Sequence, residues 1–317
     1  MEHIKHKIEK LDNQLNSDEY DSNEKYRPTK LNNIIGQDLV VTLLKKSIKD
    51  NVPIPHLLFY GSPGTGKTTT ILSYCYEMFG KEYRDYTIEL NASNDRGIDI
   101  VKERIIGFAK LRIPEGKFKV VILDEADAMT NGAQTALRKV MEDYPNTRFC
   151  IICNYPEKII PAIVSRCMEF RFNSIGDEFI KVHLTRIYQK EFGTNPNDNI
   201  INTIIMLSDG DLRKCINMLQ NFKYSNNCCD KEVFYQMEGL MDEETLDKFI
   251  NDSKNIKTKD DMIRLNDEIK RTNYSIKNII KQILMKDKTK ETELKKLLND
   301  EIDNDFVLIG LINELRK

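Results

Sequence analysis

The sequence predicts an α/β fold, in which helices cover both faces of a parallel β-sheet, followed by segments that are helical throughout. Three observations lead to this prediction. Short apolar runs alternate with helical patterns between residues 56 and 172. A glycine-rich loop directly follows the first of these runs. From residue 174 onward, the only clear periodicity is that of helices, with apolar residues spaced about 3.6 positions apart.

The strands and helices of the sheet region follow from this alternation. We expect strands at 56–60, 86–91, 118–125, 148–153 and 168–172, where the apolar runs lie. The intervening helical patterns cover Lys67–Phe79, Ile98–Lys110 and Ala133–Asp143. The predicted chain organisation has four parts: a polar, weakly ordered tail at 1–22, an α/β domain at 23–173, a small helical domain at 174–229 and a second helical domain at 230–317.

Composition excludes several classes of protein. The net charge of −2, from 48 basic and 50 acidic residues, argues against a uniformly positive surface but leaves room for a local basic face. We find no apolar run of bilayer-spanning length and no secretory signal, so we expect a soluble intracellular protein, nuclear or cytoplasmic. The seven cysteines are expected to be reduced thiols. Cys150 and Cys153 resemble a metal-binding pair, but a strand would point them to opposite faces.

A phosphate-binding loop is the strongest motif. GSPGTGKT, from Gly61 to Thr68, matches G-x-x-x-x-G-K-[ST]. Its glycines let backbone N–H groups curl around phosphate oxygens. Lys67 is expected to reach the β- and γ-phosphates of a nucleoside triphosphate, and the Thr68 hydroxyl to bind Mg²⁺. The alternative is a chance match in a glycine turn. The strand expected before the loop and the helix expected after it argue against that alternative. The expected nucleotide contacts are Gly61, Ser62, Pro63, Gly64, Thr65, Gly66, Lys67, Thr68 and Thr69.

An acidic pair follows about fifty residues later, in VVILDEAD. Asp124 and Glu125 end a buried strand, at the edge where open α/β sheets bind ligands. Asp124 is expected to hold Mg²⁺, and Glu125 to polarise the water that attacks the γ-phosphate. The alternative is a solvated acidic turn. Asp127 is expected to orient its neighbours.

Several further motifs carry a resemblance to a known family. EKYRPTKLNNIIGQD, HLLFYGSPGTGKTT, ELNASNDRGID, VVILDEADAMTNGAQTALRKVMED, ICNY, PAIVSRC and GDLRK look like the small subunits of replication factor C, the clamp loader. The resemblance covers about residues 24–222; the last ninety-five or so match only in length and helical character. It implies an AAA+ P-loop NTPase core with a five-stranded parallel sheet, then a helical lid and a C-terminal helical collar that assembles subunits.

The resemblance implies roles for further residues. Arg27, Pro28, Ile35 and Gly36 would line the adenine pocket. Asn154 resembles sensor 1, an amide that positions the attacking water or contacts the γ-phosphate; a turn-capping role is the alternative.

Two arginines match the remaining ATPase motifs of the family. Arg166, in SRC, would serve the ATP of the neighbouring subunit, because guanidinium offers a permanently charged planar fork to phosphate. On bare sequence it would instead be a surface ion-pair partner. Arg213, in GDLRK, resembles sensor 2, which would contact the γ-phosphate of the chain's own ATP.

DNA contacts are also implied by the resemblance. Five basic residues would contact DNA phosphates independently of the base sequence. Taken singly, each is equally well explained as an ordinary surface charge. The five are Arg96, Lys102, Arg138, Lys139 and Lys158. Gln134 would relay DNA or clamp binding to the catalytic site. Three departures stand out: the family's aromatic residue before EKYRP is missing, in a chain without Trp; Lys139 replaces an arginine; and NASND replaces NASDD.

The sequence therefore favours one function and leaves two alternatives open. The favoured function is an ATPase subunit that helps load a ring-shaped, PCNA-like sliding clamp onto primer–template DNA during replication. Its partners would be other clamp loader subunits, as a hetero-pentamer with a large subunit, although assembly from copies of one chain stays open. The alternatives are another AAA+ DNA-remodelling ATPase, such as a branch-migration motor or helicase loader, and a structural subunit that binds ATP without turnover.

Overall fold

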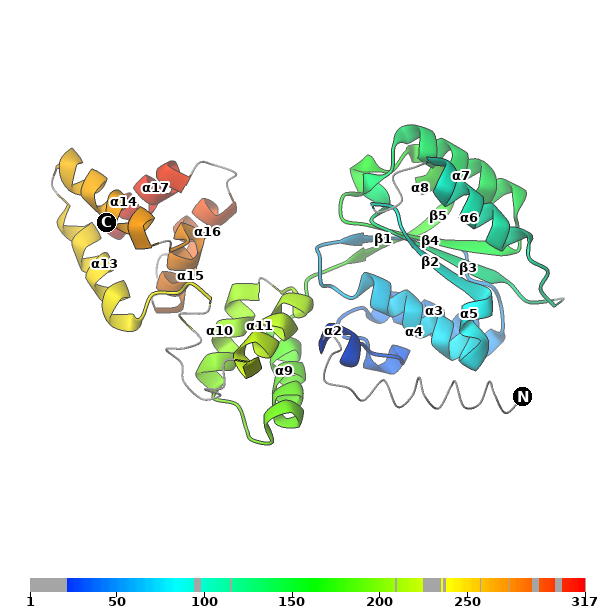
Figure 1. The fold of residues 1–317 in the computed structure, drawn as a ribbon, viewed down its shortest axis with the longest axis horizontal. Coiled ribbons are helices and arrows are strands. Elements are labelled where there is room, and N and C mark those ends of the chain that lie inside the picture. The colour runs from blue at the N-terminus through cyan, green and yellow to red at the C-terminus, as the bar shows by residue number, and fades with distance from the viewer. Residues whose placement is uncertain are drawn as a thin grey trace. The chain divides into compact units, whose positions relative to one another are not determined.

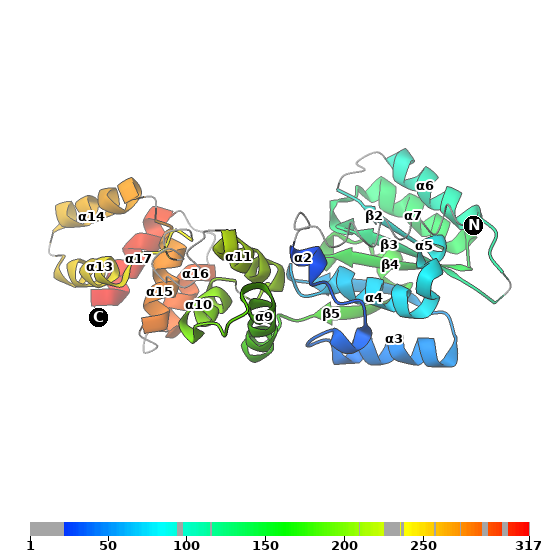
Figure 2. The same cartoon turned by 60° about the horizontal axis from the view of Figure 1, so that its bottom comes forward.

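The computed structural model describes residues 22–93, 98–114, 116–208, 210–224, 235, 238–256, 258–272, 274–286, 291–299 and 304–316. The predicted tail, except Ser22, lies outside these ranges. The chain divides into two compact units, one containing residues up to 183 together with 210–216, the other 184–209 together with 217–317. Figures 1 and 2 show the helices and strands of both units.

The first unit is built on a five-stranded parallel sheet with the order β2-β3-β4-β1-β5. Its strands are β1 (His56–Gly61), β2 (Thr87–Asn91), β3 (Lys119–Asp124), β4 (Thr147–Cys153) and β5 (Cys167–Phe172). The predicted parallel sheet is confirmed, and each strand lies within two residues of its predicted bounds. Because all strands run the same way, the loops after β1, β3 and β4 meet at one edge of the sheet.

Helices cover both faces of this sheet (Figure 1). On one face lie α3 (Asp38–Asp50), α4 (Lys67–Phe79) and α5 (Tyr83–Tyr86), with the short turns η1 (Leu31–Asn33) and η2 (Gly80–Glu82). The other face carries α6 (Ile98–Lys110), α7 (Asn131–Asp143) and α8 (Pro161–Val164), with η3 (Ala126–Ala128) and η4 (Pro156–Lys158). A short helix, α2 (Ser22–Lys25), precedes η1.

The two apolar faces of the sheet give the buried cysteines separate surroundings. Cys150 packs in the cluster that contains Leu57 and Phe59, whereas Cys153 packs in the cluster that contains Leu58 and Leu123. Their opposite directions confirm the prediction drawn from their three-residue spacing within a strand.

Two polar side chains fix the ends of helices on the second face. The Thr130 hydroxyl accepts a hydrogen bond from the Ala133 N–H (3.3 Å), so α7 begins at Asn131, two residues before its predicted start. Lys119 is 1% exposed at the start of β3. Its ammonium donates to the carbonyls of Phe108 (2.7 Å), Ala109 (3.1 Å) and Leu111, which end α6.

The described residues beyond β5 form helices, as predicted from their periodicity. These are α9 (Asp177–Phe192), α10 (Asp198–Ser208), α11 (Leu212–Tyr224), α13 (Glu243–Asn255), α14 (Lys259–Thr272), α15 (Ile276–Lys286), α16 (Glu291–Asn299) and α17 (Asn304–Arg316). In the second unit, Leu294, Leu311 and Ile312 are fully buried at the centre of an apolar cluster. None of the helices in the described ranges combines the length and apolar character that crossing a membrane requires.

Candidate nucleotide-binding site

The glycine-rich loop joins β1 to α4 and has the backbone that its composition predicts. Gly64 and Gly66 have φ values of +69° and +90°, a region that residues with a Cβ atom rarely adopt. Gly61 is constrained by a neighbouring strand, because a Cβ there would meet the Phe172 carbonyl oxygen of β5 at 2.2 Å. The loop is therefore both curled by its glycines and held close against the sheet.

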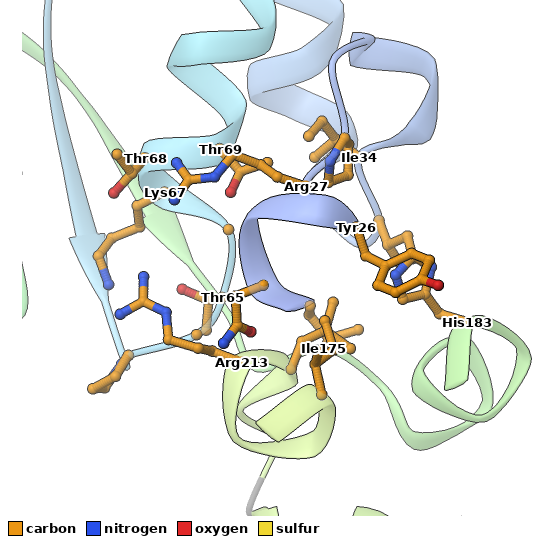
Figure 3. A pocket seen from close by; sticks show the side chains of 18 of the residues that line it. Tyr26, Arg27, Ile34, Thr65, Lys67, Thr68, Thr69, Ile175, His183 and Arg213 are labelled. Atoms are coloured by element: carbon orange, nitrogen blue, oxygen red, sulfur yellow. The ribbon is translucent and has the colours of Figure 1, made fainter. Parts of the chain in front are cut away.

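A cavity of about 340 Å³ opens beside this loop, within the first unit. Figure 3 shows the ends of the Lys67 and Arg213 side chains close together on one side of it, with Tyr26, Ile34 and His183 on the other. The cavity thus has a cationic end and a more apolar end. Its lining residues are Asn23, Tyr26, Arg27, Pro28, Asn33, Ile34, Ile35, Pro63, Gly64, Thr65, Gly66, Lys67, Thr68, Thr69, Asp124, Glu125, Asn154, Ile175, His183, Leu212, Arg213 and Ile216.

Lys67 lies at the cationic end and is 8% exposed. Its ammonium donates hydrogen bonds to the carbonyls of Gly61 (2.7 Å) and Ser62 (2.8 Å) and to Asn154 Oδ1 (3.0 Å). Burial lowers the pKa of Lys67, Arg213 acts in the same direction, and Asp124 opposes them. Two cations at one end of a partly enclosed cavity favour an anionic ligand there.

The acidic pair stands opposite the start of α4. Asp124 Oδ2 accepts a hydrogen bond from the Thr68 hydroxyl (2.6 Å), and Asp124 Oδ1 accepts from the Glu125 N–H (2.9 Å). Glu125 lies in the left-handed region, with φ 54° and ψ 39°. The Thr68 hydroxyl and the Asp124 carboxylate are oxygen ligands of the kind that Mg²⁺ prefers, so this pair fits the predicted ion.

Asp127 holds the loop that carries Asn154. Asp127 Oδ2 accepts hydrogen bonds from the backbone N–H groups of Asn154 and Tyr155, both at 3.2 Å. Asn154 follows β4, the neighbour of β3, which is why its amide reaches the same edge as Asp124. The orienting role predicted for Asp127 has a direct geometric basis in these two bonds.

Three of the four residues predicted for the adenine pocket line the cavity. Arg27, Pro28 and Ile35 line it, whereas Gly36 is not among its lining residues in the described structure. The Ser73 hydroxyl donates to the Pro28 carbonyl (2.8 Å), which ties this segment to α4. The expected aromatic residue is absent from DSN, directly before EKYRP, but the ring of Tyr26 lies at the end of the cavity opposite Lys67 (Figure 3).

Sequence reasoning missed several cavity residues. Asn23, Ile175, His183 and Ile216 lie outside the motifs quoted above. Tyr26, Asn33 and Ile34 lie within EKYRPTKLNNIIGQD and Leu212 lies within GDLRK, but none of them was given a role. It also missed Gln37, which is 6% exposed and donates to the carbonyls of Thr65 (3.4 Å) and Asn173 (3.1 Å). The available signals were membership of these motifs and, for Ile216, its position one helical turn after Leu212, the neighbour of Arg213.

Arg166 lies away from this cavity and is not among its lining residues in the described structure. It comes directly before β5, and its guanidinium donates from Nη2 to Glu142 Oε1 (2.6 Å) and from Nη1 to the Ala162 carbonyl (2.6 Å). The ion pair expected from bare sequence is therefore present.

The residues predicted to contact DNA have varied surroundings. Arg138 Nε lies 4.0 Å from Glu142 Oε1, and the Lys158 ammonium lies 4.7 Å from the centre of the Tyr155 ring. Lys139 is exposed on α7. Arg96 and the side chain of Lys102 lie outside the described structure.

Gln134 is 1% exposed and links α7 to the loop after Asn154. Its amide donates to the carbonyls of Met129 (3.3 Å) and Lys158 (2.9 Å), and its oxygen accepts from the Ile160 N–H (2.8 Å).

Comparisons with known proteins agree with the motifs. Residues 57–175 match the model of the AAA family, "ATPase family associated with various cellular activities". Replication factor C subunit 3 of Schizosaccharomyces pombe is 44% identical over 73% of this chain and 68% of its own length. The replication factor C small subunit of Halobacterium salinarum is 39% identical over 73% of this chain and 71% of its own length. The chain belongs to the replication factor C small-subunit family. The predicted resemblance is thereby confirmed.

Some replication factor C relatives are matched over a smaller share. Subunit 3 of Saccharomyces cerevisiae is 48% identical, but the match covers 63% of this chain and only 59% of that protein. The chain thus spans less than two thirds of that relative. Among solved structures, the Thermotoga maritima RuvB Holliday junction branch migration motor covers 71% of this chain and 78% of its own, with a TM-score of 0.53 at 17% identity. At that identity the likeness concerns the fold alone, and it agrees with the predicted AAA+ core.

Proposed function

We propose that this chain is an ATPase subunit of a clamp loader, which uses ATP to load a ring-shaped sliding clamp onto primer–template DNA during replication. One observation carries the proposal. In a member of the replication factor C family, Lys67, Arg213 and the Thr68–Asp124 pair converge on one end of a cavity of about 340 Å³.

The cavity suggests how the nucleotide binds. The triphosphate would lie at the cationic end, where Lys67 exchanges its bonds to loop carbonyls for phosphate oxygens and the N-terminus of α4 adds favourable charge. The base would lie toward Tyr26 and Ile34. Thr68 and Asp124 would hold Mg²⁺, which neutralises phosphate charge when bound.

Hydrolysis needs a base, an orienting group and charge stabilisation. Glu125 would accept a proton from the attacking water through a carboxylate oxygen. Asn154 would orient that water or the γ-phosphate, since Asp127 holds its backbone in place. Arg213, on the chain's own α11, would contact the same phosphate. Arg166 of an adjacent subunit would supply a further cation to the γ-phosphate.

DNA would be gripped through its phosphates. Arg96, Lys102, Arg138, Lys139 and Lys158 are the residues that we propose for these contacts, with Gln134 linking Lys158 to α7. Phosphate binding of this kind is independent of sequence and weakens steeply with salt. The partners would be further clamp loader subunits, including a large one, and a PCNA-like clamp.

Two measurements test the proposal. Lys67→Met should abolish binding of a fluorescent ATP analogue to the purified chain, because it removes the buried ammonium, whereas Lys45→Met, at an exposed position on α3, should not. In the assembled complex, hydrolysis should rise when sliding clamp and primed DNA are added together. Stimulation by four-way junctions instead would favour a branch-migration motor, and nucleotide that binds but never turns over would favour a structural subunit.

The role of Arg166 is tested separately. Arg166→Ala should leave ATP binding by the same chain intact and lower hydrolysis in the assembled complex, since Arg166 lies outside its own cavity. Wild-type turnover in an assembled Arg166→Ala complex would refute a role in trans.

A further inference from the structure

Glu142 stands between two arginines on the second face of the sheet. Its Oε1 lies 2.6 Å from Arg166 Nη2 and 4.0 Å from Arg138 Nε. Glu142 and Arg138 are four residues apart on α7, so they share one side of that helix. Arg166 comes to the same oxygen from the end of α8, a separate element of the chain.

Arg166 is held at two points. Besides the contact with Glu142, its Nη1 donates to the Ala162 carbonyl at 2.6 Å. A guanidinium has five N–H donors in a fixed plane, and these two bonds engage both of its terminal nitrogens. The orientation of the plane is thereby set, while N–H groups and the face of the guanidinium are left for a further partner.

The contact is poorly explained as a device for stability. The Arg166 and Glu142 side chains are 36% and 41% exposed. Ion pairs this open to water contribute little to folding, because solvent screens them and two long side chains lose rotamer freedom. The main effect of such a pair is to fix the orientation of the arginine side chain.

We propose that Glu142 is a positioning residue that presents Arg166 to the triphosphate of the neighbouring subunit. The inference rests on the proposed role of Arg166 in trans. An arginine already ordered in the free chain loses less conformational freedom when the phosphate reaches it, and it meets the developing charge in a fixed geometry. Glu142 would act on the nucleotide through Arg166, its nearer partner, since Glu142 itself is not among the described residues that line the cavity.

The test is a double-mutant cycle in the assembled complex. Glu142→Gln keeps the size of the side chain and removes its charge, and Glu142→Ala removes the contact altogether. Each is combined with Arg166→Ala, and ATP turnover and nucleotide affinity are measured for all variants. Asp247→Asn is the matched control, because it breaks another exposed ion pair, with Lys286 of α15.

We expect Glu142→Ala to lower turnover by about 10-fold to 100-fold, the range that a misplaced catalytic group costs, and Glu142→Gln to lower it less. Nucleotide affinity should be unchanged, and Asp247→Asn should behave as wild type. In the Arg166→Ala background, the Glu142 substitutions should have no further effect, because the group that they position is gone.

Two results would overturn the inference while leaving the proposed function intact. One is wild-type turnover by Glu142→Ala in a complex that Arg166→Ala impairs. The other is a Glu142 effect of equal size with and without Arg166. If Arg166→Ala itself has no effect, the role of Arg166 in trans fails, and the inference fails with it.

Discussion

Replacing Gly64 with alanine probes how the phosphate loop meets the start of α11. The Asp211 carboxylate caps this helix by accepting from the Lys214 N–H (3.0 Å). A Cβ at Gly64 would lie 1.7 Å from Asp211 Oδ1 and 2.2 Å from its Cγ, far inside contact distance. The substitution must therefore displace either the loop or the capping carboxylate.

The size of the effect follows from two terms. Overpacking of this kind costs about 1–3 kcal/mol, and alanine at a φ of +69° adds about 1–2 kcal/mol. A loss of about 3 kcal/mol would lower the melting temperature of a unit of this size by about 6–12 °C. Gly116→Ala provides the control, because Gly116 has a similar φ of +79° and its Cβ would meet no described atom within 4 Å.

Differential scanning calorimetry of both variants separates the terms. We expect Gly64→Ala to lower the melting temperature clearly more than Gly116→Ala does. The difference between the two variants measures the overlap with Asp211. Adding Asp211→Ser, which keeps a capping hydroxyl on a shorter side chain, should recover part of the loss. Equal losses for the two glycine variants, or no recovery with Asp211→Ser, would refute the close approach of Asp211 to the loop.

Three further predictions concern buried polar groups. Burial, aided by Arg148, lowers the pKa of His56 to about 4, and its neutral Nδ1 accepts from the Phe149 N–H (3.2 Å). The unfolded chain takes up this proton between about pH 6.5 and 4 and the folded chain does not. The unfolding free energy should therefore fall by about 1–2 kcal/mol over that window, and by less in His56→Gln, in urea titrations at several pH values. Gln134→Met should cost about 2–4 kcal/mol in the same assay, because two carbonyls and one N–H lose their partner; a change under about 0.5 kcal/mol would contradict those bonds. Lys119→Met should speed amide hydrogen exchange in the last turn of α6, whereas unchanged exchange there would show that the ammonium does not cap the helix.

The local signals in the sequence were sufficient for much of the fold. The helices Lys67–Phe79 and Ile98–Lys110 have the bounds that their periodicity predicts. The phosphate loop could be predicted since its glycines and Lys67 serve a local geometry. Asp124 and Asn154 were predicted at one edge because parallel strands bring their carboxyl ends together.

Tertiary contacts explain what the sequence did not reveal. Lys119 opens an apolar run and gives no sign that it would be buried against the end of α6. Gln37 reads as an ordinary polar residue, although it holds the phosphate loop through Thr65. The contact of Arg166 with Glu142 joins residues 24 positions apart. Such pairings depend on how elements pack, which neither spacing nor periodicity encodes.

The backbone conformation of Glu125 lowers stability at a position whose side chain is proposed to act in hydrolysis. Its left-handed conformation, φ 54° and ψ 39°, disfavours a side chain with a Cβ by about 1–2 kcal/mol, and glycine or asparagine would occupy it with less strain. A screen that selects only for heat resistance would therefore enrich glycine or asparagine at position 125. The selected variants would be more stable to heat but would lack the carboxylate that is proposed to activate water. Engineering this chain for stability should therefore keep Glu125 unchanged.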